Sequence, residues 1–440
     1  MTNILIFGAG KSSSYLYQYL LSVSAHYDWN ITSVDADLKV AQDRIGNNPK
    51  GKAIQLDIFE DDTRKKLIQN ADFVISLLPP SLHIIVAKDC LEYSKNLVTA
   101  SYVSDEIQAL HEDVAKKQLT FMNEIGLDPG LDHLSAMKII HELENEGAII
   151  HTFKSYCGGL VAPVSDDNPW HYKVSWNPQN IVNAGKAGAE FLQDNTKKHL
   201  SYEQLFREVE IIDVPNFGAL AAYANRDSLK YKNIYGLSDI KTLLRATFRH
   251  EDFCIAWNVV VNLGLVDDKI KMNTQNTTYF QWFKSITHLQ TAEEIKEKIF
   301  SIAATKPDVA YHLLNWLELF SNKPIPKEGE FTSSQILQML IEEKWKMKKE
   351  DKDMIVMHHE FGYTLQNQNK QKTSTLIVEG ENNIYTAMAK TVGLPMAIYT
   401  KLFLTGKINN LYGVQIPTSE MVYKPILDEL EQYQVKFIES

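Results

Sequence analysis

The stretch NILIFGAGKSS at residues 3–13 decides the fold that the sequence predicts. A short apolar run ends at Gly8, and the next segment, SYLYQYLLSV at 14–23, repeats its large apolar side chains at helical spacing. This pattern indicates a strand, a tight turn and a helix. Gly8 and Gly10 are the first two glycines of a dinucleotide-binding turn, where one permits the turn and the other lets a pyrophosphate approach the helix N-terminus. Ser13 replaces the third glycine and is small enough for close packing of helix on strand.

The same alternation of strand and helix continues along the chain. Further apolar runs at 31–35, 52–57, 72–79, 96–101 and 119–126 are separated by helical segments. This alternation predicts an α/β fold with a Rossmann-type, doubly wound parallel sheet. We expect this dinucleotide-binding domain to span 1–125 and to be completed by residues 390–440.

The pattern of strand-like and helical segments changes after residue 125. Segments 126–264 and 351–389 mix strand-like runs with Gly-, Asn- and Pro-rich loops, which predicts a mixed α+β domain for substrate binding and dimerisation. Helical patterns dominate 265–350, and we interpret this segment as a helical insertion. The apolar segment 386–406 reads as a long helix, broken or kinked near Gly393 and Pro395.

Composition narrows the class of ligand. The chain has 440 residues, 44% of them hydrophobic, and a formal net charge of -10. Nucleic acids and anionic membranes need a basic surface, so we expect neither as a partner and infer a small ligand. Three widely spaced cysteines suit neither a disulfide framework nor a metal site and favour a reducing, cytoplasmic location. No apolar run approaches the roughly 20 residues that span a bilayer.

Two acidic residues end the second and third predicted strands. Asp35 is placed where a carboxylate would accept hydrogen bonds from an adenosine ribose and repel a 2′-phosphate, which favours NAD over NADP. Alternatively Asp35 only caps the helix that opens at Leu38, a role that Asp37 could fill equally well. Asp57 could lie near the adenine or only cap its own turn.

Other loops follow the predicted strands at the same edge of the sheet. They carry Leu78-Pro79-Pro80, then Ser101-Tyr102, then Gly126-Leu127-Asp128-Pro129-Gly130. Ligands bind at this edge in such folds, although each loop by itself could be simple turn chemistry. The cofactor contacts that we expect are Gly8, Ala9, Gly10, Lys11, Ser12, Asp35, Asp57, Ile58, Leu78, Ala100, Ser101, Leu127, Asp128 and Pro129.

Arginine usage gives a separate signal. The chain has only six arginines, yet Arg226, Arg245 and Arg249 lie close together in sequence. The planar guanidinium binds carboxylates in a bidentate manner, so a chain that otherwise prefers lysine could have placed these residues for a ligand. Surface or structural ion pairs are the alternative.

Several long strings carry a family resemblance. MNEIGLDPGLDH at 122–133 and FKSYCGGLVAPVSDDNPWHYKVSWNP at 153–178 closely resemble saccharopine reductase, the glutamate-forming saccharopine dehydrogenase family. The likeness extends to NRDS at 225–228, RATFRH at 245–250 and TVGLPMAIYTKLFLTGKI at 391–408, and it covers essentially the whole chain.

The resemblance implies a reaction in lysine metabolism. Saccharopine, NAD(P)+ and water would be converted reversibly to L-glutamate, 2-aminoadipate 6-semialdehyde and NAD(P)H. A hydride leaves the carbon beside a secondary amine, and water hydrolyses the resulting imine. The protein must align the nicotinamide with that carbon, accept the amine proton and hold three carboxylates. A homodimer is expected by the same analogy.

The resemblance also assigns residues. Arg226 and the segment Thr247-Phe248-Arg249 would hold carboxylates, Trp176 would form an aromatic wall, and Cys157-Gly158-Gly159 would let backbone approach the ligand, although Trp176 could be core and Cys157 a buried small hydrophobe. The implied substrate contacts are Ser101, Tyr102, Asp128, Cys157, Gly158, Trp176, Arg226, Thr247, Phe248 and Arg249. Candidate catalytic residues are Asp128, Tyr102 and Cys157, and the general base could be Asp128, Tyr102, His133, His171 or water.

The chain departs from the family in two places. NADP-using members carry Arg after the second strand, whereas this chain has Asp35 and Ala36, so we predict NAD as the cofactor. Lys11 stands in the glycine turn where the family commonly has an apolar residue. Three other functions compete: a carboxynorspermidine dehydrogenase-like enzyme of polyamine synthesis, a non-catalytic dinucleotide sensor, and a methyltransferase that uses the same glycine turn.

Overall fold

The computed structural model describes all 440 residues and divides them into two compact units. The first unit combines residues 1–146 with 376–438, and the second combines 147–375 with 439–440. The first boundary therefore falls after Glu146 and not near residue 125. Helix α7 (Leu131–Asn145) belongs to the first unit because it packs on α17 (Glu420–Leu430) from the C-terminal segment.

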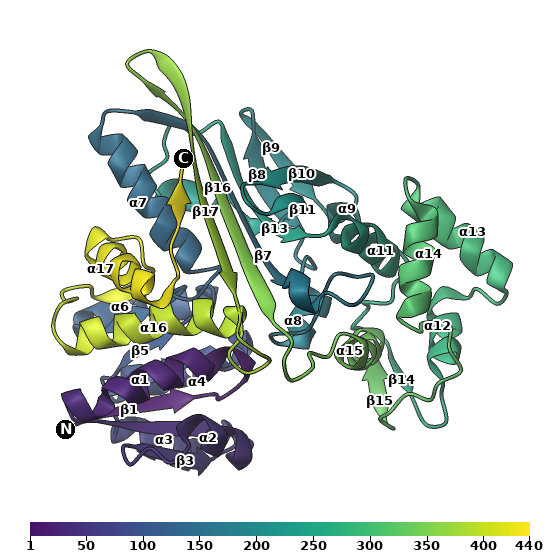
Figure 1. The fold of residues 1–440 in the computed structure, drawn as a ribbon. Helices are drawn as coiled ribbons and strands as arrows, with labels where there is room; N and C mark the ends of the chain where they lie inside the picture. The colour runs from purple at the N-terminus through teal and green to yellow at the C-terminus, as the bar shows by residue number, and fades with distance from the viewer. The chain divides into compact units, whose positions relative to one another are not determined.

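A seven-stranded parallel sheet forms the centre of the first unit (Figure 1), in the order β18-β6-β5-β4-β1-β2-β3. The predicted Rossmann-type sheet is confirmed. All six predicted strands are present, and the C-terminal segment supplies a seventh. The strands are β1 (Thr2–Phe7), β2 (Trp29–Asp35), β3 (Gly51–Gln55), β4 (Phe73–Ser76), β5 (Asn96–Thr99), β6 (Thr120–Met122) and β18 (Gly413–Gln415).

Helices cover both faces of this sheet, so its central strands are apolar along their length: Ile4 to Phe7 of β1 are all buried. The helices are α1 (Ser14–Tyr27), α2 (Leu38–Ile45), α3 (Asp61–Gln69), α4 (His83–Glu92), α5 (Asp105–Gln108), α6 (His111–Lys116), α7, α16 (Ala387–Leu404) and α17. Short 3₁₀ turns at Lys11–Ser13, Pro80–Leu82 and Glu431–Tyr433 complete the unit.

Helix α16 corrects one prediction. It runs unbroken from Ala387 to Leu404 with Pro395 inside it. Gly393 has a packing role: a Cβ there would lie 2.8 Å from the backbone nitrogen of Leu16, in α1. The missing side chain therefore lets α16 lie close against α1, and glycine at this position does not break the helix.

The order of the strands creates a switch point between β1 and β4, because the chain runs from β1 outward to β2 and β3 and then returns to β4. Ligands bind in the crevice at the carboxyl ends of the strands at such a point. Gly8 and Leu77 follow these two strands, and a Cβ on Gly8 would come within 2.9 Å of the Leu77 carbonyl oxygen. The two loops are thus in direct contact.

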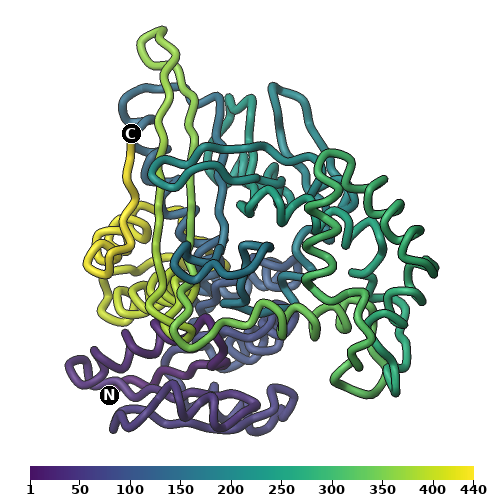
Figure 2. The backbone as a smooth tube through the Cα atoms, turned by 45° about the vertical axis from the view of Figure 1, so that its right-hand side comes forward, coloured from purple at the N-terminus to yellow at the C-terminus, as the bar shows by residue number.

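A ten-stranded mixed sheet forms the second unit, with the main order β10-β11-β13-β7-β16-β17-β19. Strands β7 and β13 are parallel, and β16 pairs with β7 in antiparallel fashion. Figure 2 shows the long strands β16 and β17 running side by side. The strands are β7 (Ile149–Val161), β8 (Ala189–Gln193), β9 (Thr196–Leu200), β10 (Val209–Val214), β11 (Gly218–Ala224), β12 (Arg226–Asp227), β13 (Thr242–Arg249), β16 (Asp353–Leu365), β17 (Gln368–Glu379) and β19 (Ile438–Glu439).

Helices of the second unit gather around a tryptophan-rich core. Trp170, Trp257, Trp282 and Trp345 are buried together with apolar side chains of the segment predicted as a helical insertion. The helices are α8 (Pro178–Asn183), α9 (Tyr202–Leu205), α10 (Tyr231–Ile234), α11 (Glu251–Asn262), α12 (Tyr279–Thr287), α13 (Ala292–Ala303), α14 (Pro307–Trp316) and α15 (Ser333–Lys344). A small sheet of β14 (Lys271–Asn273) and β15 (Glu330–Thr332) and a 3₁₀ turn at Pro163–Ser165 complete it.

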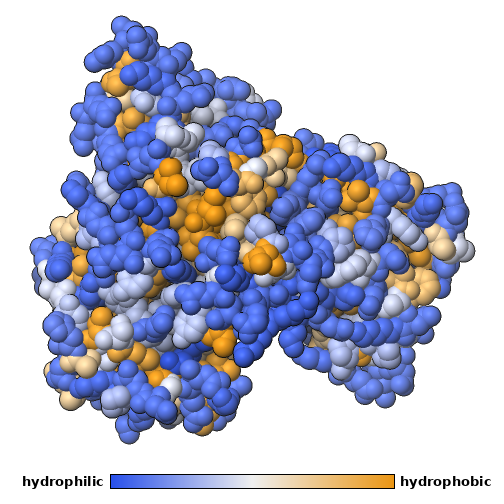
Figure 3. Space-filling view, in the orientation of Figure 1, coloured by the Kyte–Doolittle hydropathy of each residue, from blue (hydrophilic) through white to orange (hydrophobic).

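Hydrophilic side chains dominate the face drawn in Figure 3, where hydrophobic residues appear in small groups. No helix combines the length and apolar character needed to cross a bilayer.

Candidate active site

The glycine turn of the first unit is the first part of the candidate site. Gly8 has φ +98°, a conformation that favours glycine, and it lies against Leu77. Gly10 has an ordinary φ of -65°, and a Cβ on it would meet nothing within 4 Å. Packing inside the protein therefore does not require glycine at position 10. A ligand phosphate that approaches the backbone closely would require glycine at this position, so the turn fits a dinucleotide.

Asp35 ties this turn to the second strand. One carboxylate oxygen accepts a hydrogen bond from the Ala9 backbone nitrogen at 2.8 Å, and the other accepts from the Asp37 nitrogen at 3.0 Å. Asp37 is the residue that caps α2, since its side chain accepts from the backbone nitrogens of Lys39 and Val40. Asp35 is thus engaged by main-chain donors and holds the turn in shape.

Arg44 of α2 lies against the same turn, and sequence reasoning missed it. Its Nε donates to the Ala9 carbonyl at 3.1 Å and to the Ser13 hydroxyl at 3.0 Å, and a terminal nitrogen donates to the Gly10 carbonyl at 3.0 Å. All three acceptors are uncharged. A guanidinium is therefore held beside the backbone that a phosphate would approach.

The remaining cofactor candidates lie along the carboxyl edge of the sheet. Asp57 is exposed and accepts from the Phe59 nitrogen at 3.0 Å, which caps its own turn, while Ile58 is buried. Leu78 is half-buried. A Cβ on Gly126 would lie 2.8 Å from the Ala100 Cβ, so the loop after β5 touches the loop after β6.

Two candidate catalytic residues meet at this edge. The Tyr102 hydroxyl donates to the Asp128 carboxylate at 3.0 Å, and both side chains are half-exposed. The two loops are also joined through Glu124, which is buried and accepts from the Val103 nitrogen at 3.0 Å. Its own backbone nitrogen donates to the Ser101 carbonyl at 3.1 Å. Buried hydrogen bonds of Glu124 thus support the half-exposed Tyr102–Asp128 pair from below.

His133 belongs to the same buried hydrogen-bond network as Glu124. It is fully buried on α7, and its Nε2 lies 2.9 Å from the Glu124 carboxylate. His133 therefore lies in the protein interior, whereas the other two candidate proton acceptors of this unit, Tyr102 and Asp128, are half-exposed. Leu127 is also buried, and Pro129 follows Asp128 through a cis peptide bond.

In the second unit, one face of the sheet gathers several predicted substrate residues. Side chains two apart on a strand share a face, so Arg245, Thr247 and Arg249 of β13 lie together and Phe248 points to the other face. The register places Cys157 of β7 beside Thr247. Gly158 faces Phe248, where a Cβ would lie 2.7 Å from the Phe248 carbonyl oxygen, so glycine is needed there for strand packing.

Arg249 is a buried cation with unused hydrogen-bonding capacity. Only 4% of its surface is exposed. One terminal nitrogen donates to the Phe248 carbonyl at 2.7 Å, and Nε has no hydrogen-bond partner. The guanidinium lies 5.0 Å from the centre of the Tyr172 ring. Buried arginines are normally paired with an anion, so this arrangement suits an anionic ligand.

Trp176 adjoins this arginine through Tyr172. The indole Nε1 donates to the Tyr172 hydroxyl at 2.9 Å, and Trp176 is partly buried. The structure therefore brings Trp176 and Arg249 into one cluster, with Tyr172, which sequence reasoning missed, between them. Arg226 is exposed on β12, where it pairs with β8, and the neighbouring Asn225 nitrogen donates to the Arg245 carbonyl of β13.

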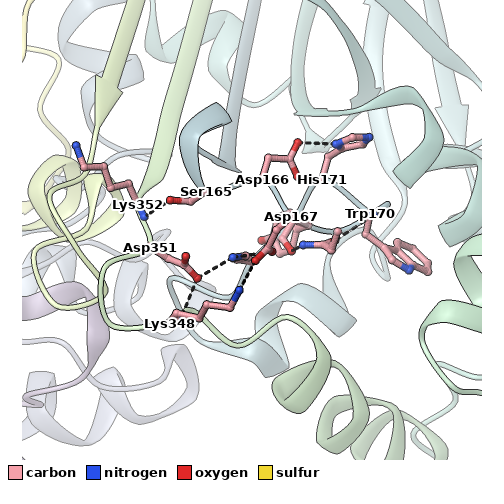
Figure 4. Close-up of polar contacts among 11 residues, drawn as sticks. Ser165, Asp166, Asp167, Trp170, His171, Lys348, Asp351 and Lys352 are labelled. Atoms are coloured by element: carbon pink, nitrogen blue, oxygen red, sulfur yellow. Dashed lines mark hydrogen bonds and ion pairs between the residues drawn. The ribbon is translucent and has the colours of Figure 1, made fainter.

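Ion pairs fasten the loop that carries Tyr172 (Figure 4). The buried Lys173 ammonium lies 2.7 Å from Asp351 and 2.8 Å from Asp167. The His171 Nδ1 lies 2.6 Å from Asp166. The loop is thereby fixed to the segment before β16, which explains why the aromatic residues beside Arg249 are held in place.

Comparison with known proteins identifies the family. Residues 126–435 match the model of the saccharopine dehydrogenase C-terminal domain, and residues 4–122 match that of the saccharopine dehydrogenase NADP binding domain. The chain belongs to the saccharopine dehydrogenase family. The resemblance inferred from the sequence is confirmed.

Members of the saccharopine dehydrogenase family resemble this chain along its whole length. It is 32% identical over 437 residues to the Saccharomyces cerevisiae saccharopine dehydrogenase [NADP(+), L-glutamate-forming], covering 98% of this chain and 96% of the relative. It is also 32% identical to the Arabidopsis thaliana alpha-aminoadipic semialdehyde synthase, of which it spans 45%. The apo saccharopine dehydrogenase (L-Glu forming) of S. cerevisiae superposes with a TM-score of 0.87 at 31% identity, covering 100% of this chain and 99% of that one.

The predicted preference for NAD is wrong. The family model over residues 4–122 is an NADP binding domain, and the S. cerevisiae and Schizosaccharomyces pombe relatives are named NADP(+) enzymes. The prediction assumed that the Asp35 carboxylate faces the ribose, whereas both of its oxygens accept main-chain hydrogen bonds. It also overlooked Arg44, which no local sequence pattern connects to the turn.

Proposed function

We propose that this protein is an NADP-dependent saccharopine dehydrogenase of the L-glutamate-forming kind. Saccharopine, NADP+ and water would be converted reversibly to L-glutamate, 2-aminoadipate 6-semialdehyde, NADPH and a proton. The observation that carries the proposal is Arg249, a buried guanidinium with an unpartnered Nε beside Tyr172 and Trp176. A substrate with three carboxylates supplies the anion that such a group requires.

In this proposal separate sets of side chains bind the cofactor, take up the proton and bind the substrate carboxylates. The turn from Gly8 to Ser13 and Arg44 would hold NADP, which supplies the hydride acceptor when bound. The Tyr102–Asp128 pair would take up the amine proton, because a half-exposed carboxylate hydrogen-bonded to a phenol can accept one. Arg249 and Arg226 would bind carboxylates, and Trp176 would form an apolar wall.

Other site candidates keep supporting roles in the proposal. Thr247 and Cys157 would line the substrate beside Arg249, and Cys157 is too buried, at 6% exposure, to serve as an accessible nucleophile. Ser101, Leu127 and Ala100 would contact the nicotinamide end.

The direct test is the formation of NADPH from NADP and saccharopine, followed by absorbance. We expect turnover with saccharopine and none with carboxynorspermidine, the substrate of the competing polyamine enzyme. Turnover of the polyamine alone would contradict the proposal, and NADPH binding without any turnover would favour a sensor.

Arg249→Gln tests the carboxylate site. Loss of the buried charge should lower kcat/KM for saccharopine by roughly 30- to 1000-fold, the equivalent of about 2–4 kcal/mol, without changing NADPH affinity. Arg207→Gln is a matched control, since Arg207 is exposed and pairs only with its neighbour Glu208. Equal activities of the two variants would remove Arg249 from the site.

We also propose a homodimer in a reducing, cytoplasmic environment. The three cysteines are buried and form no disulfide, which supports the redox assignment. Light scattering on the purified chain would test the dimer, and a mass of about 50 kDa, the monomer value of 50.2 kDa, would contradict it.

A further inference from the structure

His83 lies under the carboxyl edge of the sheet in the first unit and has no role in the reaction as described above. It is the first residue of α4 and follows β4 and the 3₁₀ turn at Pro80–Leu82. Only 2% of its surface is exposed. Its imidazole thus lies in the interior, directly beneath the loops that carry the proposed site.

Three hydroxyl groups surround the imidazole. Nδ1 lies 2.8 Å from the Ser76 Oγ at the end of β4. Nε2 lies 2.8 Å from the Ser101 Oγ and 3.2 Å from the Thr99 Oγ1 at the end of β5. The ring therefore bridges two neighbouring strands, and both of its nitrogens have hydrogen-bond partners.

The ring is neutral at physiological pH. Burial lowers the pKa of His83 to about 4, and no carboxylate contributes to the shift. A neutral imidazole has one donating and one accepting nitrogen, so it can bind hydroxyl groups at both nitrogens without carrying a charge. In either tautomer the Nε2 contact occupies one hydrogen-bonding position of the Ser101 Oγ, so His83 restricts where this oxygen lies.

The main chain of Ser101 is held separately. Its carbonyl accepts from the Glu124 nitrogen at 3.1 Å, and its nitrogen donates to Thr99 Oγ1 at 3.3 Å. With the backbone fixed, rotation about the Cα–Cβ bond is the main freedom left to the Ser101 oxygen, and the contact with Nε2 restricts it. Ser101 directly precedes Tyr102, which pairs with Asp128.

We propose that His83 is a positioning residue for the dehydrogenase reaction, which orients the Ser101 hydroxyl so that it can hydrogen-bond the bound ligands beside the Tyr102–Asp128 pair. The inference rests on the proposed function and deepens it. His83 does not touch the ligands itself and acts only through Ser101.

Two amide variants separate positioning from packing. The longer amide side chain introduced by His83→Gln can place its terminal group near the position of Nε2, whereas the shorter amide introduced by His83→Asn reaches only the position of Nδ1. We expect His83→Gln to retain kcat within about threefold of wild type, while His83→Asn and His83→Leu lower kcat by roughly 10- to 100-fold with a smaller change in KM. Equal losses in His83→Gln and His83→Leu would overturn the proposal.

A double-mutant cycle with Ser101→Ala tests whether His83 affects kcat through Ser101. If His83 acts through Ser101, the losses in kcat caused by His83→Leu and Ser101→Ala will not add in the double variant. Additive losses would overturn the proposal. His141→Leu is the matched control, because this half-buried histidine on α7 also contacts a hydroxyl, that of Tyr423 at 2.9 Å, yet lies outside the site.

The two proposals fail in distinguishable ways. Absence of wild-type turnover with saccharopine contradicts the proposed function. In that case the same cycle is measured on the Kd of NADPH, where non-additive losses support the role of His83 and additive losses overturn it. Thermal unfolding of each variant confirms that the compared proteins are folded.

Discussion

At the scale of single residues, the site depends on side chains whose roles follow from their partners. Asp35 was expected to select the cofactor, but it organises the glycine turn by accepting two main-chain hydrogen bonds. Arg44 showed no pattern in the sequence, and yet its guanidinium contacts three acceptors in that turn. The chemical type of a residue restricts its possible roles, and its neighbours select one of them.

Arg44→Gln should weaken NADPH binding. Removal of the guanidinium takes a positive charge and three hydrogen bonds away from the turn, so we expect the Kd of NADPH to rise by roughly 5- to 50-fold, equivalent to about 1–2.3 kcal/mol. Fluorescence titration of NADPH measures the effect. Lys39→Gln in the same helix is the control, since Lys39 pairs only with Asp43 on the surface. An unchanged Kd in Arg44→Gln would show that the guanidinium serves only the fold.

His83 also gives the protein a measurable dependence of stability on pH. Its pKa is lowered by burial to about 4 in the folded protein, against an ordinary value near 6.5, so the unfolded chain binds the extra proton first as pH falls. The stabilisation contributed by neutral, buried His83 is fully present above pH 6.5. It is lost progressively as the pH falls toward 4, which lowers the free energy of unfolding by up to roughly 3 kcal/mol.

Urea unfolding of wild type and His83→Gln across this range measures that contribution. The variant lacks the titrating group, so the wild type should lose stability relative to it as pH falls. Parallel stability curves would show that His83 does not titrate as described.

At the scale of elements, two glycines illustrate two uses of a missing side chain. Gly393 of α16 lies against Leu16 of α1, where a Cβ would come within 2.8 Å of a backbone nitrogen. Gly10 lies in the turn, where a Cβ would meet no atom within 4 Å. The first glycine therefore serves helix packing, whereas packing does not explain the second, and we propose that it lets a ligand approach the backbone.

Alanine at each position should separate these uses. We expect Gly393→Ala to lower the free energy of unfolding by about 1–3 kcal/mol, because the added methyl forces α16 away from α1. Gly10→Ala should leave thermal stability almost unchanged and raise the Kd of NADPH by roughly tenfold or more, since the methyl obstructs the approach of the pyrophosphate. The opposite pattern, with a stable Gly393→Ala and a destabilised Gly10→Ala, would contradict this assignment.

At the scale of the whole molecule, the first unit is assembled from two distant parts of the chain. Strand β18 pairs with β6, and α17 packs on α7, so residues beyond 404 complete a sheet that begins at residue 2. Val422, Ile426 and Leu430 of α17 are buried in the process. We therefore expect folding of this unit to require both its N-terminal and its C-terminal segment.

A chain that ends at residue 405 tests this requirement. It lacks β18 and α17, exposes the apolar surface of α7, and should lose cooperative thermal unfolding and NADPH binding. A chain that lacks only Glu439 and Ser440 is the control, since these residues belong to the second unit and Ser440 hydrogen-bonds to Thr373. Normal NADPH binding by the shorter chain would contradict the requirement.

The sequence by itself determined the parallel sheet, the glycine turn and the family. These follow from local patterns, because strand and helix periodicity, turn glycines and long motif strings are properties of neighbouring residues. The strings around residues 122–133 and 153–178 were sufficient for the family.

Only the tertiary structure decided which side chains meet. His83 and Ser101, Arg44 and Gly10, and Tyr172 and Arg249 are separated by 18 or more positions along the chain, and chain folding brings each pair into contact. The incorrect prediction of NAD has the same origin. The position of Asp35 at a strand end is a local fact, but the donors that occupy its carboxylate are set by the packing of the turn against β2 and α2.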